Sequence, residues 1–133
     1  MATAGPPAGL TDTDILIDAL HGLPLAINFL VAQRAGGGLG ISVITAMELV
    51  VGCRNTAELA NLRQFLAGVT TWPVDVGVSQ RGYQLMESFC LSHGLTIPDS
   101  LIAATALERG LTLYTRNVRH FQMIPGLAVT RPY

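Results

Sequence analysis

Short apolar segments alternate with longer helix-like segments along almost the whole chain. Apolar segments suited to strands lie at residues 9–12, 39–43, 70–74, 111–115 and 127–130. Segments with a helical pattern lie between them, at residues 15–20, 24–33, 44–52, 55–67, 79–91 and 99–108. Strands that alternate with helices favour a parallel sheet with helices on both of its faces. The sequence therefore predicts an α/β fold of three layers, α/β/α, around a central parallel sheet.

Glycine and proline mark several of the expected boundaries. Pro24 is suited to the first turn of a helix, and the three glycines at residues 36–38 end that helix. Gly110 is suited to the C-terminal cap of the helix before it. A chain of 133 residues is long enough to bury a proper core as one domain. We expect a single domain over residues 10–133, preceded by a flexible segment over residues 1–9.

Neither a membrane span nor a signal peptide is expected. The longest apolar stretch, residues 25–32, contains Asn28 and is shorter than the roughly 20 residues of a transmembrane helix. Residues 1–9 lack the positive charge and the apolar run of a signal peptide. We therefore expect a cytoplasmic protein without a membrane partner. Its mean hydropathy of +0.44 is high for a soluble monomer and predicts an apolar surface that meets a partner.

The charged residues are few and their types are restrictive. Only 13% of the chain is charged, the net charge is -1, and every cationic residue is arginine. The absence of lysine excludes Schiff-base chemistry and phosphate binding by a P-loop. The near-neutral charge argues against indiscriminate nucleic-acid binding, which needs many phosphate contacts. An enzyme that acts on nucleic acid would need a local arginine cluster or a metal ion.

Three carboxylates stand among residues that favour burial: Asp12, Glu48 and Asp99. A carboxylate near a core edge is costly unless it is paired, hydrogen-bonded or bound to a cation, so the three together predict a metal site. Asp12 ends the first strand, Glu48 lies in the helix after the second, and Asp99 lies in a first helical turn. Residues 115–117 follow the strand at 111–115. Since ligands gather at the carboxyl ends of parallel strands, we expect these groups at one rim of the sheet.

Each carboxylate also has an ordinary structural interpretation. Asp12 could cap the first helix, although Asp14 is the expected cap if Asp12 binds metal. Glu48 could be a solvated helix residue, and Asp99 a first-turn carboxylate favoured by the helix dipole. The remaining acids are expected on solvated faces or in local pairs: Asp18, Glu58, Asp75, Glu87 and Glu108.

Taken together, these segments resemble the PIN-domain nucleases, and among them the VapC-type toxins of bacterial toxin–antitoxin pairs. The matching pieces are residues 12–18, residues 41–45 with Glu48, Leu49 and Gly52, and the long segment 97–121. The last is the most specific, because it contains Pro98 and Asp99 and continues through Thr115-Arg116-Asn117 to His120-Phe121. The resemblance covers nearly the whole chain after residue 9.

The resemblance implies a PIN-like three-layer fold and an endoribonuclease that depends on Mg²⁺ or Mn²⁺. By this resemblance Asp12, Glu48, Asp99 and Asn117 are the catalytic residues, and Asp12 and Asp99 are the metal ligands. Glu48 would orient or deprotonate the attacking water, and the products would be a 5′-phosphate and a 3′-hydroxyl. The implied partners are RNA, a VapB-type antitoxin whose tail covers the acidic site, and a second copy of the chain.

The chain departs from the family pattern at the fourth acidic position. Family members often place an Asp third in the Thr-x-Asp turn or just before the Phe, where this chain has Asn117 and His120. His120 could favour a site with one metal, lower the metal affinity, or contact a substrate phosphate. We expect Thr115, Arg116, Arg119 and His120 to contact the substrate. For the two arginines, an equal interpretation is that they are solvated residues at the end of a strand.

Two other functions are weighed against the nuclease. The Asp-x-Asp pair at residues 12–14 is found in haloacid-dehalogenase-like phosphatases, but those enzymes also need a lysine, which this chain lacks. The second alternative is a PIN-like module that binds RNA or a protein partner without efficient cleavage, and the missing fourth acid keeps it open.

Overall fold

The computed structural model describes residues 9–133, and residues 1–8 lie outside the described part of the chain. Gly9 was expected both at the end of the flexible segment and at the start of the first strand; it is buried as the first residue of that strand. The strands are β1 (Gly9–Thr11), β2 (Gly40–Ser42), β3 (Thr70–Trp72), β4 (Thr112–Tyr114) and β5 (Val129–Thr130). The α-helices are α1 (Thr13–Leu20), α2 (Pro24–Ala35), α3 (Val43–Val51), α4 (Thr56–Leu66), α5 (Val76–His93) and α6 (Ile97–Arg109). A short 3₁₀ helix, η1, spans Val118–His120.

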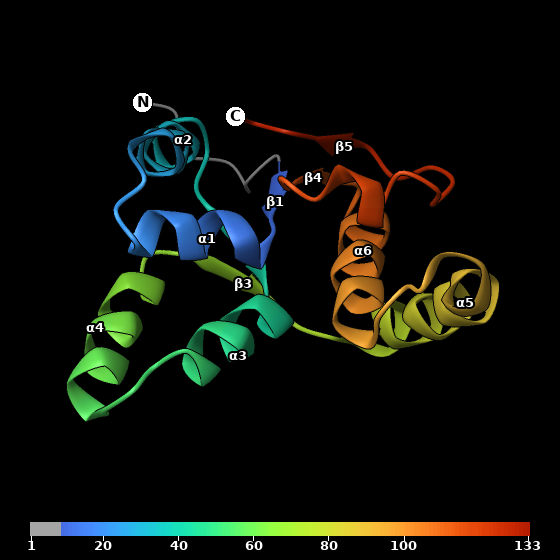
Figure 1. Ribbon diagram of the computed structural model, residues 1–133, viewed down its shortest axis with the longest axis horizontal. Helices are drawn as coiled ribbons and strands as arrows, with labels where there is room; N and C mark the ends of the chain where they lie inside the picture. The colour runs from blue at the N-terminus through green and yellow to red at the C-terminus, as the bar shows by residue number, and fades with distance from the viewer. Residues whose placement is uncertain (1–8) are drawn as a thin grey trace.

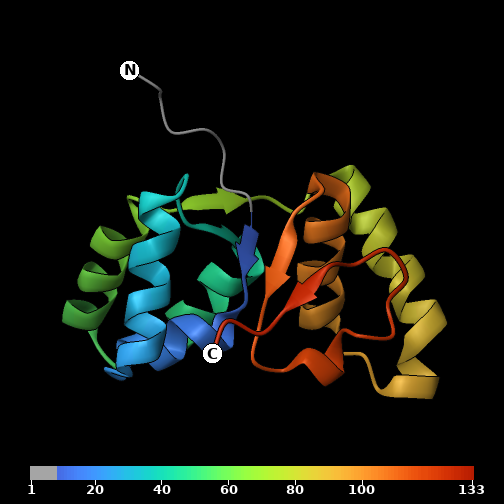
Figure 2. The ribbon, with the colours of Figure 1, turned by 90° about the horizontal axis from the view of Figure 1, so that it is seen from above.

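All strand pairs are parallel, which confirms the predicted α/β class. Strands β1, β4 and β5 form one hydrogen-bonded sheet in that order, and β2 pairs with β3 in a second. The two ladders lie next to each other because β1 packs beside β2. Figure 2 shows the strands between two groups of helices, with α1 to α4 on one side and α5 and α6 on the other. The arrangement has the three layers that the sequence predicts. It differs from the prediction of one central sheet because the strands form two separate hydrogen-bonded sheets.

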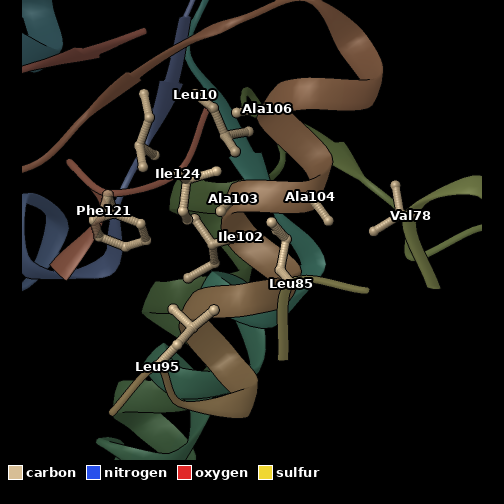
Figure 3. Close-up of a cluster of buried hydrophobic side chains, with 11 residues drawn as sticks. Leu10, Val78, Leu85, Leu95, Ile102, Ala103, Ala104, Ala106, Phe121 and Ile124 are labelled. Carbon is tan, nitrogen blue, oxygen red and sulfur yellow. The ribbon is translucent and has the colours of Figure 1, made fainter. Parts of the chain in front are cut away.

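Each side of the sheet has its own hydrophobic core. On one side α5 and α6 pack closely together, and Leu10, Ile102 and Phe121 lie in the core that they form with β1 and β4 (Figure 3). Leu113 of β4 belongs to the same core. The other core lies among α1 to α4, and its fully buried members include Ile15, Leu39 and Ile41. Burying a side chain of this size stabilises the fold by roughly 1.5–3 kcal/mol. Because both cores press on the strands, they hold the strand ends in fixed places.

Side-chain caps decide where several helices begin. The Asp75 carboxylate accepts a hydrogen bond from the Val78 N–H at 2.9 Å, so α5 begins at Val76 and not at residue 79 as expected. The prediction that Asp14 caps α1 is wrong, because the N-cap is Asp12. Gly94 and Gly110 end α5 and α6 in the left-handed conformation, with φ of 68° and 65°.

Figure 1 shows α1 and α2 as separate helices that meet at a sharp turn. Among residues 9–133, no single helix has both the length and the hydropathy to cross a membrane. The pair α1 and α2 reaches these limits only together, across a bend of 116°.

Candidate active site

Asp12 lies directly after β1, where the ends of two parallel strands meet. Its N–H donates to the Tyr114 carbonyl at 2.9 Å, which continues the pairing of β1 with β4. The side chain is 5% exposed. Its Oδ1 accepts from the Thr13 N–H and its Oδ2 accepts from the Thr115 hydroxyl, both at 2.8 Å. Thus Asp12 caps α1 and also faces the end of β4, so the two interpretations of this residue are compatible.

Glu48 lies in α3, and Thr13 connects it to Asp12 because Thr13 makes a hydrogen bond to each of the two carboxylates. The Thr13 hydroxyl donates to Glu48 Oε1 at 2.7 Å and lies 2.9 Å from the Thr45 hydroxyl. Both threonines are buried, so this contact fixes the carboxylate against the N-terminus of α1. Sequence analysis missed Thr13. Its position directly after a candidate ligand was the available signal, but a partner 35 residues away leaves no local pattern.

Asp99 lies in the first turn of α6, as predicted, and the side chain of His120 reaches it from η1. His120 Nδ1 is 3.5 Å from Asp99 Oδ2. The Asp99 side chain is 24% exposed, whereas that of His120 is 60% exposed. His120, the residue at which the chain departs from the pattern it resembles, is therefore the more exposed partner of this carboxylate.

Burial and mutual repulsion disfavour the charged forms of these carboxylates. Burial is the main cause that raises the pKa of Asp12 to about 7, and the charges of Asp14 and Asp99 raise it further. Burial likewise raises the pKa of Asp99, and the charge of Glu48 adds to the effect while His120 opposes it. These influences connect Asp12, Asp99 and Glu48 in one electrostatic cluster. A buried carboxylate with a raised pKa, such as Asp12 beside these acids, is typical of a functional site.

The donor set suits a hard divalent cation. Asp12 and Asp99 offer carboxylate oxygens, and a bound cation would relieve the repulsion that raises their pKa values. Mg²⁺ takes one or two protein carboxylates and completes its coordination with water and substrate phosphate. Within the described chain, no three His, Cys, Asp or Glu side chains are arranged to hold a metal ion by themselves.

Arg116 is paired with acids of α1 that lie outside the cluster of Asp12, Glu48 and Asp99. Its Nη1 donates to Asp18 Oδ2 at 2.8 Å, and its backbone N–H donates to Asp14 Oδ2 at 2.9 Å. Its guanidinium also lies over the ring of Tyr133, 5.4 Å from the ring centroid. We expected this guanidinium to contact substrate, but the structure pairs it with Asp18, one of the acids expected on a solvated face or in a local pair. Burial raises the pKa of Asp14 as well.

The remaining predicted residues lie along the segment that follows β4. Thr115 is buried, and its hydroxyl accepts from the Asn117 N–H at 3.0 Å while it donates to Asp12. Asn117 and Arg119 are exposed. This segment therefore starts at the buried carboxylate cluster and carries polar side chains into solvent.

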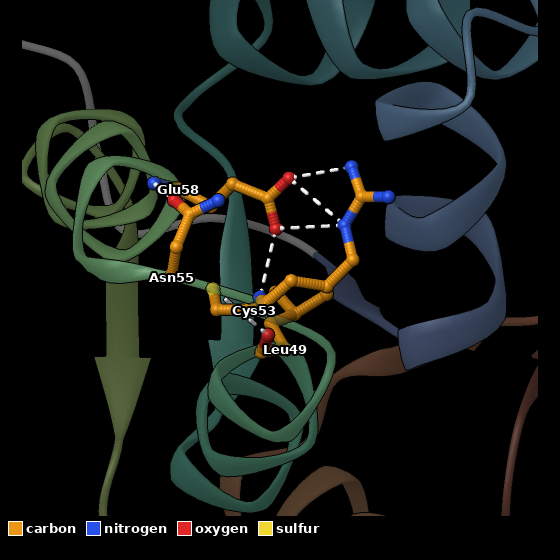
Figure 4. A network of polar contacts seen from close by, with 5 residues as sticks. Leu49, Cys53, Asn55 and Glu58 are labelled. Atoms are coloured by element: carbon orange, nitrogen blue, oxygen red, sulfur yellow. Dashed lines mark hydrogen bonds and ion pairs between the residues drawn. The ribbon is translucent and has the colours of Figure 1, made fainter.

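A pocket of about 770 Å³ opens between α1, α3 and α4 and has Glu48 among its lining residues. Most of its wall is apolar, with Ile17, Leu20, Leu62 and Phe65 among the lining residues. Figure 4 shows part of the pocket wall near the start of α4. There Glu58 Oε2 accepts a hydrogen bond from Arg54 Nη2 at 2.7 Å. The pocket thus joins an apolar surface to the acidic site.

Comparison with known proteins assigns the family. Residues 10–126 match the PIN domain. The chain is 39% identical over 119 residues to Ribonuclease VapC10 from Mycobacterium tuberculosis, with 89% of each chain covered. It is 38% identical over 121 residues to Ribonuclease VapC19 from the same organism, with 89% of this chain and 95% of the relative covered. A toxin–antitoxin complex from Klebsiella pneumoniae contains a chain of the same fold, with a TM-score of 0.78, 33% identity, and coverage of 94% and 98%. With the fold and the acidic rim described above, these matches show that the chain belongs to the PIN domain family.

Proposed function

We propose that the protein is a metal-dependent endoribonuclease and acts as the toxin of a VapBC-type pair. The observation that carries this proposal is the cluster that Glu48 of α3 and Asp99 of α6 form with Asp12 at the end of β1, where burial and repulsion raise the pKa of Asp12 to about 7. Carboxylates placed at such a cost suit a cation site better than a structural one. The two relatives named as ribonucleases support RNA as the substrate.

Asp12 and Asp99 would hold one Mg²⁺ or Mn²⁺ ion, with water as the other ligands. When bound, the ion supplies charge neutralisation at the scissile phosphate and lowers the pKa of a water molecule. The Thr115 hydroxyl keeps Asp12 Oδ2 in place, and the Thr13 hydroxyl keeps Glu48 in place. Each contact fixes a carboxylate before substrate arrives, which is the preorganisation that catalysis requires.

Glu48 would take a proton from the attacking water. The water oxygen then forms a bond to phosphorus, the bond from phosphorus to the 3′ oxygen breaks, and a proton is delivered to that oxygen. The products are a 5′-phosphate and a 3′-hydroxyl. Arg119 and His120 lie on the solvent side of the same rim and would contact the RNA backbone, and the exposed Asn117 would have the catalytic role that the resemblance implies. Arg116 is paired with Asp18, and its expected contact with substrate stays a prediction.

Cleavage of RNA by the purified protein should depend on a divalent ion. We expect a structured RNA to be cut with Mn²⁺ or Mg²⁺ and to stay intact with excess EDTA, since carboxylates alone supply no positive charge to stabilise the negative charge on the phosphate. Fluorescently labelled RNA resolved on a sequencing gel measures this, and adding back Mn²⁺ after chelation is the control. Cleavage that continues in EDTA would contradict the metal-dependent mechanism. Binding of RNA and Mn²⁺ without cleavage would favour the non-catalytic module.

An antitoxin is the second proposed partner, and it would occupy the pocket between α1, α3 and α4. The pocket is mostly apolar and includes Glu48, so an apolar segment bound there would reach the acidic site. The toxin–antitoxin complex of the same fold from Klebsiella pneumoniae supports an antitoxin as the partner, and the place of binding is proposed from the pocket alone. A homodimer stays a prediction that sedimentation can test; exposed apolar side chains on α2, such as Leu25 and Val31, are consistent with it.

Replacing Leu20 by Glu should weaken antitoxin binding at least tenfold and leave RNA cleavage unchanged. Leu20 is 56% exposed and lines the pocket, so a charge there would face the apolar surface of the partner. The measurement is the Kd for the antitoxin encoded beside this gene, with Leu91→Glu as a matched control. Leu91 lies on α5 and is fully exposed. Equal affinities for the two variants would place the antitoxin elsewhere.

A further inference from the structure

We infer that Asp14, Asp18, Arg116 and Tyr133 form a rim anchor that positions the segment after β4 against α1. In this assignment Arg116 is a positioning residue, and Tyr133 secures it from the segment that follows β5. The inference rests on the proposed nuclease function, because the positioned segment carries Thr115 and Asn117. Its experimental test includes a measurement that does not depend on cleavage.

The rim anchor is a continuous set of contacts between parts of the chain that are distant in sequence. Arg116 Nη1 and the Tyr133 hydroxyl both donate to Asp18 Oδ2, each at 2.8 Å. The Arg116 backbone N–H donates to Asp14 Oδ2 at 2.9 Å. Asp14 and Asp18 are four residues apart on α1, so they lie on one face of that helix. Arg116 is therefore held at both its backbone and its side chain by the same helix.

Tyr133 contributes more than one contact. Its ring lies under the Arg116 guanidinium, at 5.4 Å from the ring centroid, which is within the range of a cation–π interaction. Its hydroxyl is also the largest influence that lowers the pKa of Asp18, and so it favours the ionised form that pairs with Arg116. The Asp18 and Arg116 side chains are 23% and 39% exposed. An isolated pair at this exposure contributes little, whereas a network of charge-assisted bonds with a stacked ring restricts the geometry.

Arg116 of the rim anchor is directly adjacent in the chain to two residues of the proposed site, Thr115 and Asn117. Thr115, which precedes Arg116, donates to Asp12 Oδ2, and Asn117, which follows it, donates its N–H to the Thr115 hydroxyl. A displacement of Arg116 would move both neighbours. A misplacement of about 1 Å at a catalytic group can cost about 10²-fold in rate. The rim anchor thus connects a segment outside the site to the placement of a proposed metal ligand.

Kinetics of three variants separate positioning from substrate contact. We expect Arg116→Ala to lower kcat about 10–100-fold with little change in KM, because its guanidinium faces Asp18 and not the RNA. Asp18→Asn and Tyr133→Phe should lower kcat in the same way by smaller factors. The double variant Arg116→Ala/Asp18→Asn should be no slower than Arg116→Ala, because in this inference Asp18 acts on the segment through the Arg116 side chain.

Arg119→Ala is the matched comparison, since Arg119 is an exposed arginine on the same segment. We expect it to raise KM and to reduce the dependence of binding on log salt concentration by about one phosphate contact. The same pattern for Arg116→Ala would overturn the inference, because it would make Arg116 a phosphate contact. Losses in kcat that add in the double variant would also overturn it.

Amide hydrogen exchange provides the measurement that is independent of cleavage. In Tyr133→Phe and Asp18→Asn, we expect the Arg116 and Asn117 amides to exchange at least tenfold faster, while the Leu113 amide in β4 is unchanged. Unchanged exchange at Arg116 and Asn117 would overturn the rim anchor even if the protein is a nuclease. Faster exchange in a protein that cuts no RNA would support the anchor and would reject the nuclease function separately.

Discussion

The Asp99→Asn variant is expected to cut RNA about 10²–10³-fold more slowly than the wild type and to keep its fold. Asparagine retains the size of the side chain but offers a cation no charge, and metal-assisted stabilisation of a phosphate transition state contributes several kcal/mol. The loss should appear in kcat/KM at saturating Mn²⁺, measured on the same labelled RNA. Binding of Mn²⁺, followed by calorimetry, should weaken in parallel.

The melting temperature distinguishes a metal ligand from a structural carboxylate at this position. Burial raises the pKa of Asp99, so removing its charge removes the free-energy cost of keeping a charged carboxylate partly buried in the metal-free protein. We therefore expect the melting temperature of Asp99→Asn to be no lower than that of the wild type. Glu87→Gln, which neutralises an exposed carboxylate on α5, is the control and should change neither quantity. A large fall in melting temperature together with full activity would assign Asp99 a structural role.

The Asp12→Asn variant should be more stable than the wild type when metal is absent and the pH is 8. The folded-state pKa of Asp12 is about 7, against 3.8 for its ordinary value. The folded protein therefore binds more protons than the unfolded chain between about pH 4 and 7, and the Asp12 contribution to stability falls as the pH rises through that range. Asparagine removes this penalty and gives up one of two hydrogen bonds, so we expect a gain of about 1–3 kcal/mol.

Thermal unfolding at two pH values tests this sign. At pH 8 the gain corresponds to a rise of about 3–10 °C in melting temperature for a domain of this size. At pH 5 the carboxyl is protonated in the folded protein but ionised in the unfolded chain, so only part of the penalty remains and the gain in melting temperature should be clearly smaller than at pH 8. Adding Mn²⁺ at pH 8 should stabilise the wild type and leave Asp12→Asn unchanged. A variant that is less stable than the metal-free wild type at pH 8 would show that the Asp12 charge supports the fold.

The fold was largely predictable because its signals are local. The parallel α/β architecture follows from the alternation of apolar strands with helices, and Pro24 begins α2 as expected. The start of α5 was placed late because Val76 and Val78 favour strands, although Asp75 before them is a good N-cap. The break between the two ladders was not predictable, since the strand order and the missing pairing of β1 with β2 leave no local pattern in the sequence.

The positions of the acids along the chain were predictable, but their connections were not. The topology of a parallel sheet is enough to bring Asp12 next to the residues after β4. The contact of Thr13 with Glu48 and the pairing of Asp18 with Arg116 depend on side-chain rotamers across 35 and 98 residues. For the same reason Arg116 resembled a phosphate contact in the sequence, where its neighbours are polar and its partner is not visible.

A map of new RNA 5′ ends in bacteria, after brief induction of the wild type or of Asp99→Asn, tests the central claim most directly. It requires no assumption about the substrate. We expect discrete new ends that carry a 5′-phosphate with the wild type alone, and their positions would identify the RNA and the cleavage site. Identical maps from the two proteins, with the wild type folded and free of antitoxin, would contradict the nuclease and leave a module that binds without cutting.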